Sequence, residues 1–218
     1  MAFWRSTEEI GDDVGLNMDL AKEAIGHYSR VAGVGISIID SRGKPLYSVG
    51  YTGLCCKFCS EVRDILDTEK DYCDRVHLYG GYQSERFGGR YIFFCPLGLA
   101  HWASPISSGG MVRGYLLCGP VLMMTPEEFL IEDLLLKNRI KKEHLGRLKE
   151  NLKHIPVVPP DKVTSLSELL FMVASHISDA EYLQNLNQAE FYNHQSDISE
   201  YIHSIKAVSG DQGDSTEY

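Results

Sequence analysis

The beginning of the chain carries the pattern of a helix followed by a β-hairpin. Apolar residues recur at helical spacing from Asn17 to Val31, and Gly33 stands just beyond them, as is typical of a helix end. Gly35–Asp40 is rich in β-branched residues, and a Ser-Arg-Gly-Lys-Pro turn sequence separates it from a second strand-like run, Pro45–Tyr51. This part predicts an amphipathic helix and two antiparallel strands.

The middle of the chain combines helical segments with its most apolar strands. From Cys55 to Phe87 apolar and cysteine residues recur at helical spacing, and Gly80-Gly81 is predicted to break the helix. Arg90–Leu99 is the most apolar short run, which predicts a central strand. Two further strands follow in the prediction, joined at Ser107–Gly110, the second running over Met111–Met123.

The last part of the chain is predicted to be helical. Thr125 and Pro126 suit the cap and first position of a helix, and Pro156–Pro160 reads as a stiff connector. From Asp161 onward apolar residues alternate at threes and fours, which favours a core or dimer-forming helix. The predicted organisation is a domain over residues 1–155, an amphipathic helical extension for signalling or dimerisation over 156–208, and a disordered polar tail over 209–218.

Charge and composition narrow the classes of partner. The chain has 21 basic and 30 acidic residues, a formal net charge of −9, so it lacks the basic surface of a nucleic-acid-binding protein. No run approaches the roughly 18 apolar residues of a membrane span, and the N-terminal residues do not resemble a signal peptide. We therefore expect a cytoplasmic protein that binds neither nucleic acid nor membrane directly, with its cysteines reduced.

All six cysteines lie in the segment from Cys55 to Cys118. Cys55 and Cys59 are one helical turn apart, as are Cys73 and His77, so each pair can face one point. Thiolates and imidazoles suit zinc or an iron–sulfur cluster. This spacing makes such a cofactor one hypothesis, with these candidate ligands: Cys56, Cys59, Cys73 and Cys95.

Two other interpretations of the cysteines remain open. Free cysteine often serves as a small buried hydrophobe, and a strong zinc pattern would contain two clean Cys-x-x-Cys pairs. A cysteine nucleophile would need a nearby imidazole, for which His77 and His101 are candidates, but no local motif is typical of a cysteine hydrolase. We therefore expect a protein that is not an enzyme.

Several short elements between Cys59 and Val121 occur in a characteristic order. They are Cys59, Cys73, the run Cys95-Pro96-Leu97-Gly98-Leu99, Pro105-Ile106, Gly114 and Cys118-Gly119-Pro120-Val121. In this order they resemble the PocR sensory domain, the ligand-binding module of a regulator of propanediol and cobalamin genes. Two positions depart from the family pattern, because Pro96-Leu97 stands where the family has His-Ala and Pro120 where it has Gln, and these changes could alter the ligand.

The resemblance implies an α/β fold of the α+β type, with a PAS-like antiparallel sheet flanked by helices and a helical C-terminal extension. It also implies capture of a small organic ligand, such as a short diol, an aldehyde or another hydrocarbon derivative. The family's usual output partners are a histidine kinase or a transcription regulator. Since the residues after Val121 are acidic and helical, we expect a stand-alone sensor, as a homodimer, that acts on a regulatory protein; the alternative is a cysteine-based metal or redox sensor.

A pocket between the sheet and the helices is the expected ligand site. Aromatic and thiol side chains would contact an apolar ligand body, and a few polar groups would orient its hydroxyls. The predicted ligand-binding residues are Cys59, Cys73, His77, Phe93, Cys95, His101, Trp102, Tyr115 and Cys118.

Overall fold

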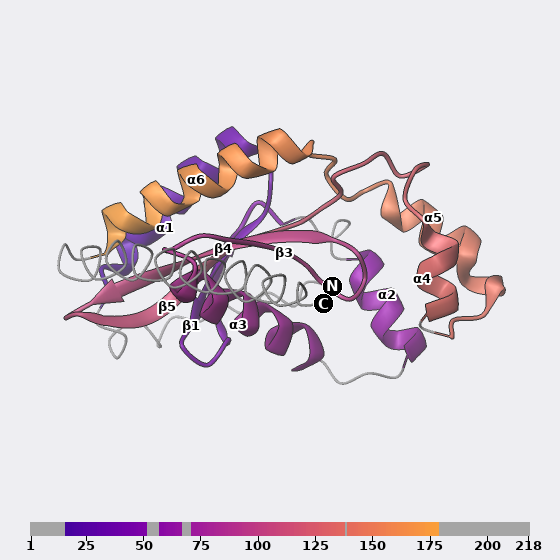
Figure 1. Cartoon of the computed structure of the whole chain (residues 1–218), viewed down its shortest axis with the longest axis horizontal. Helices are drawn as coiled ribbons and strands as arrows, with labels where there is room; N and C mark the ends of the chain where they lie inside the picture. The colour runs from indigo at the N-terminus through magenta and orange to yellow at the C-terminus, as the bar shows by residue number, and fades with distance from the viewer. Residues whose placement is uncertain (1–15, 52–56, 67–70, 138, 179–218) are drawn as a thin grey trace, which may run out of the picture.

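A computed structural model describes residues 16–51, 57–66, 71–137 and 139–178. One five-stranded antiparallel sheet forms its centre, in the order β2-β1-β5-β4-β3. The strands are β1 (Ile36–Asp40), β2 (Pro45–Val49), β3 (Tyr91–Phe94), β4 (Ala100–Ser108) and β5 (Met111–Val121). Helices cover both faces (Figure 1), which confirms the predicted α+β class with an antiparallel, PAS-like sheet flanked by helices.

The apolar run predicted as a central strand is an edge strand. Within the described part of the chain β3 pairs only with β4, and the chain then turns back over Cys95–Leu99, where the Cys95 amide donates to the Leu99 carbonyl at 2.9 Å. The run is apolar because it serves two separate cores. Phe93 is buried under the neighbouring helix, whereas Leu97 and Leu99 are buried in a second cluster beyond the sheet.

One face of the sheet is covered by two helices that lie side by side, α1 (Met18–Ala32) and α6 (Pro160–Ile177) (Figure 1). Tyr28 of α1 joins them to the sheet, because its hydroxyl donates to the Leu166 carbonyl at 2.8 Å and accepts from the Trp102 indole at 2.9 Å. At the end of α6, the Ser178 hydroxyl accepts a 2.9 Å hydrogen bond from the Ser107 amide of β4.

The position of α6 corrects the predicted organisation. Its apolar stripe lies in the same core as α1 and the sheet, so the helix completes the domain instead of extending beyond it. The boundary predicted at residue 155 therefore cuts through a single packed unit. The rest of the predicted extension, residues 179–208, and the predicted tail over 209–218 lie outside the described residues.

The opposite face carries α3 (Asp71–Arg86), which lies very close to β4 and β5 (Figure 1). A methyl group at Gly80 would stand 2.2 Å from the Phe93 ring, and one at Gly81 would stand 2.6 Å from the Tyr115 ring. The glycine pair that was predicted to break the helix therefore lies inside it. Two residues without side chains are what allow the helix backbone to rest on these rings.

A second core forms beside the sheet. It is built by α2 (Lys57–Leu66), α4 (Ile131–Lys137), α5 (Leu145–Leu152) and the turn after β3. Glu61 of α2 accepts a hydrogen bond from Asn151 and pairs with Arg147, both on α5. The Thr125 hydroxyl donates to Glu128 at 2.9 Å, but this contact closes a turn, and the helix predicted to start at Thr125 begins only at Ile131.

Across the described residues, no helix combines the length and apolar character that crossing a bilayer requires.

Candidate functional site

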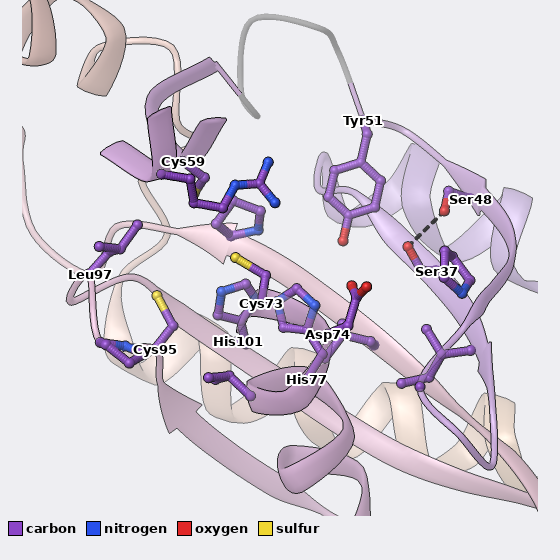
Figure 2. A pocket seen from close by; sticks show the side chains of 18 residues that line it. Ser37, Ser48, Tyr51, Cys59, Cys73, Asp74, His77, Cys95, Leu97 and His101 are labelled. Atoms are coloured by element: carbon purple, nitrogen blue, oxygen red, sulfur yellow. Dashed lines mark hydrogen bonds between the residues drawn. The ribbon is translucent and has the colours of Figure 1, made fainter. Parts of the chain in front are cut away.

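A cavity of about 390 Å³ lies on the α3 side of the sheet (Figure 2). Its wall is drawn from β1, β2, α2, α3, the turn after β3, and the facing residues of β4 and β5. Most of the wall is apolar, with a small number of polar side chains directed at the same space. This size and composition are typical of small-molecule sites in proteins.

Three thiols from three elements line this one cavity. Cys59 comes from α2, Cys73 from α3 and Cys95 from the turn after β3 (Figure 2). Burial raises the pKa of the Cys73 and Cys95 thiols above their usual values. The two thiols are therefore protonated at neutral pH, which disfavours a role as nucleophile.

Two imidazoles also line the cavity. The rings of His77 and His101 lie 5.0 Å apart, and His101 stacks on Phe93 at 5.5 Å. Burial lowers the pKa of His77 to about 4 and that of His101 well below its usual value. His101 is only 3% exposed, and its Nδ1 is buried without a hydrogen-bond partner. Both rings are therefore neutral at physiological pH.

Because these imidazoles are neutral in the folded protein, the free energy of unfolding should decrease as the pH falls below neutrality. Since the folded pKa of His77, about 4, lies below its unfolded value, its contribution is complete above about pH 6.5 and is lost as the pH falls through 4. We expect the free energy of unfolding to drop by up to about 1.4 kcal/mol per pH unit in that window. Urea unfolding at pH 7.5, 6 and 5 measures this, and His77→Gln should reduce the slope whereas exposed His176→Gln should not. Equal slopes in all three proteins would contradict the assignment.

Two predicted ligand-binding residues are on the wrong face of the sheet. Trp102 and Cys118 are paired across β4 and β5, and both are fully buried in the core under α1 and α6. The prediction placed His101 and Trp102 on one wall, which is physically inconsistent because successive strand residues point to opposite faces. Trp102 and Cys118 are therefore core residues.

Two others lie on the correct face but behind the cavity wall. Phe93 is buried against Gly80, and Tyr115 is buried against Gly81 with its hydroxyl donating to Glu85. Neither is among the residues that line the cavity. The two rings lie between α3 and the sheet, so a substitution of either would change ligand affinity by moving that helix.

Sequence reasoning missed the charged residues of the wall, Arg63 and Asp74. A signal was present, since Arg63 lies one helical turn after Cys59 and Asp74 directly follows Cys73. At the other side of the cavity lie Tyr51, Ser37 and Ser48, and the two serine hydroxyls are hydrogen-bonded at 2.8 Å (Figure 2). Pro96-Leu97 and Pro120, the positions that depart from the PocR pattern, also line the cavity.

The predicted metal site finds no direct support. Among the described residues, no three histidine, cysteine or acidic side chains are arranged as a metal-binding group. Cys56, one of the four candidate ligands, lies outside those residues. Deprotonation of the buried thiols would add to the cost of binding a metal. A zinc or iron–sulfur cofactor therefore stays a prediction.

The fold and the cavity define a class: an antiparallel α+β domain with a small-molecule pocket between the sheet and its covering helices. The chain belongs to the PocR sensory-domain family, since the model described as the sensory domain found in PocR matches residues 15–182. This match includes α6, in agreement with its place in the core. Family membership gives the protein a sensory role.

Comparison with other proteins adds little to this assignment. No curated protein matches the chain. Among solved structures, the crystal structure of a domain assigned to the IclR family of transcriptional regulators is 14% identical, with a TM-score of 0.36 over 78% of this chain and 95% of that one. That likeness is too distant to carry an argument.

Proposed function

We propose that this domain binds a small organic ligand in the cavity and passes the signal to a regulatory protein. The observation that carries the proposal is the convergence of polar side chains from α2, α3 and the sheet on one mostly apolar cavity of about 390 Å³. A water molecule occupies about 30 Å³ in the liquid. A ligand of roughly ten non-hydrogen atoms would therefore fill the cavity better than a three-carbon diol.

The chemistry of the wall supports a hydrocarbon derivative. Protonated thiols and neutral imidazoles offer polarizable contact surface and weak hydrogen bonds, which suits an apolar ligand body with one or two oxygen atoms. Longer diols and aldehydes meet this description. The same protonation states argue against Cys73 or Cys95 as a thiolate nucleophile and against His77 or His101 as a cationic acid.

Helix α2 is the element suited to pass the signal on. Its Cys59 and Arg63 line the cavity, whereas Phe58 and Val62 are buried in the second core and Glu61 contacts α5. A ligand that prefers one position of α2 would shift the α4–α5 unit with it, to the extent of its differential affinity for the two positions. We infer that the partner protein reads that shift.

Thermal unfolding with a panel of neutral compounds tests the proposal. A compound present at about one hundred times its Kd should stabilise the fold by about 2.7 kcal/mol, or roughly 5–10 °C in Tm. Cys73→Phe, which fills the cavity, should abolish the shift, and Glu23→Phe on the exposed side of α1 should preserve it. The panel covers diols, aldehydes and alcohols of three to eight carbons.

The cysteine-based alternative is decided by the same assay. Three thiols at one wall are the observation that favours it. Zinc chloride and hydrogen peroxide therefore join the panel. If either changes the Tm while every organic compound leaves it unchanged, the small-molecule proposal is wrong and the metal or redox sensor replaces it.

A further inference from the structure

Two serine hydroxyls from neighbouring strands meet at the wall of the cavity. Ser37 of β1 and Ser48 of β2 stand directly opposite each other in the antiparallel register, and their Oγ atoms are 2.8 Å apart. Both side chains line the cavity (Figure 2). Ser37 is only 9% exposed, so its hydroxyl is almost entirely removed from bulk water. The pair is therefore a small polar area in a mostly apolar wall.

The alternation of side chains along β1 directs this pair at the cavity. Ile36 and Ile38 are fully buried in the core under α1 and α6, whereas Ser37 and Ile39 point to the opposite face and line the cavity. A hydrogen bond between two serines on paired strands contributes only modestly to the stability of a sheet. The position of the pair at the cavity therefore points to a role in recognition.

The hydrogen-bonding capacity of the two hydroxyls is only partly used. Each serine hydroxyl has one hydrogen to donate and two lone pairs that accept. One of the two hydrogens is used in the bond between Ser37 and Ser48, and within the described residues neither hydroxyl makes another hydrogen bond. One donor and several acceptor positions therefore remain, on two oxygen atoms that lie 2.8 Å apart.

We propose that Ser37 and Ser48 determine the specificity of the cavity by selecting a ligand hydroxyl over a carbonyl oxygen. This inference rests on the proposed function and assigns the residues that hold the polar end of its ligand. A ligand hydroxyl accepts from one serine and donates to the other, which closes a ring of three hydroxyls that each donate once and accept once. A carbonyl oxygen only accepts, so it makes one of these two hydrogen bonds and loses the other.

The neighbouring side chains suit a neutral ligand that donates. The Tyr51 ring lies against Gly35, where a methyl group would stand 2.5 Å from it, and its hydroxyl is directed at the same space as the two serines (Figure 2). The carboxylate of Asp74 belongs to the same wall, and a carboxylate accepts hydrogen bonds and repels anions. The hydrocarbon part of the ligand would then extend toward Cys95 and Leu97 at the other side of the cavity.

Matched alcohols and ketones test the selection. Each secondary alcohol from 2-propanol to 2-octanol has the same carbon skeleton and the same number of non-hydrogen atoms as its ketone. We expect the alcohol to bind about fivefold more tightly, the factor for one hydrogen bond between neutral groups. Dissociation constants obtained from thermal shifts over a concentration series measure the difference in the unmodified protein, without relying on the folding of any variant.

A double variant links the preference to the two serines. Ser37→Ala/Ser48→Ala removes both partners of the hydrogen bond, so it leaves no unpaired group and should change stability little. The preference for alcohols should disappear in this variant, and the 1,2-diols of the panel should lose affinity by a similar factor. Ser165→Ala is the control, because this serine is exposed on α6 and its hydroxyl donates to the Asp161 carbonyl of the same helix.

The outcomes separate a failure of this inference from a failure of the proposed function. If a ketone binds as tightly as its alcohol, or if the double variant keeps the preference and the affinity for diols, the serines do not select the ligand and the small-molecule sensor stands. Binding of aldehydes or ketones without binding of any hydroxyl compound leads to the same conclusion. If no alcohol, ketone, diol or aldehyde binds, the proposed function itself falls.

Discussion

Replacing Trp102 by alanine should lower the free energy of unfolding by about 3–5 kcal/mol. The indole is fully buried between the sheet and helices α1 and α6, and its Nε1 donates to the Tyr28 hydroxyl at 2.9 Å. Removing it leaves a large cavity in the main core and takes one hydrogen bond from Tyr28. Urea unfolding monitored by circular dichroism measures the loss.

The companion variants test whether this is a core effect. Trp102→Phe keeps most of the volume and loses the indole N–H, so it should cost less than Trp102→Ala. Tyr28→Phe leaves the indole donor unpaired and should cost about 1–3 kcal/mol. If Trp102→Ala changed ligand affinity strongly while leaving stability intact, the ring would belong to the site after all, and the assignment of the two sheet faces would be wrong.

The second large effect is expected at Gly81, where valine should destabilise the protein by about 1–3 kcal/mol and weaken ligand binding as well. Any side chain there meets the Tyr115 ring, since the first carbon alone would stand 2.6 Å away. To relieve the overlap α3 has to rise from the sheet, and this helix carries Cys73 and His77 of the cavity wall.

Gly146 offers a matched control for that substitution. It is also a helical glycine, in α5, and an added side-chain carbon would meet nothing within 4 Å. Gly146→Val should be neutral or slightly stabilising because valine is a better helix former than glycine. Equal stability of the two variants would show that the close approach of α3 to the sheet is not needed.

The order of the elements could be predicted from the sequence because local signals mark most of their ends. Gly33 does end α1, with its amide bonded to the Ser29 carbonyl at 2.9 Å, and the Ser-Arg-Gly-Lys-Pro turn does join β1 to β2. Both signals depend on backbone chemistry within a few residues. They need no knowledge of what lies on the far side of the molecule.

The partners of each element could not be predicted in the same way. An apolar stripe at threes and fours, as in α6, is the same whether the helix packs in its own core or against a second copy. The run from Arg90 to Leu99 is mostly apolar because its two halves pack in different cores. Its pattern of apolar and polar residues therefore does not change at Cys95, where the chain turns. In both segments the packing partners come from distant parts of the chain, which the local sequence pattern does not reveal.

For the site, helical spacing predicts which cysteines and histidines share a wall, and strand alternation decides which residues of β4 and β5 face it. The pairing of Cys73 with His77 follows from their separation by one turn, and both line the cavity. The alternation of side chains along β4 excludes one of His101 and Trp102 from the cavity face, and Cys118 follows Trp102 because the two are paired across β4 and β5. Arg63 lies one turn after Cys59 on α2 and lines the same cavity, so the helical spacing that identifies the cysteine also identifies the arginine.

The hydrogen bond between Ser107 and Ser178 joins the end of α6 to the sheet. Ser178 caps the C-terminal end of α6, and its hydroxyl accepts from the Ser107 amide near the end of β4, so the two elements are joined there directly. A hydrogen bond between the ends of two elements couples their positions. A tilt of β4 would therefore displace the C-terminal end of α6 with it.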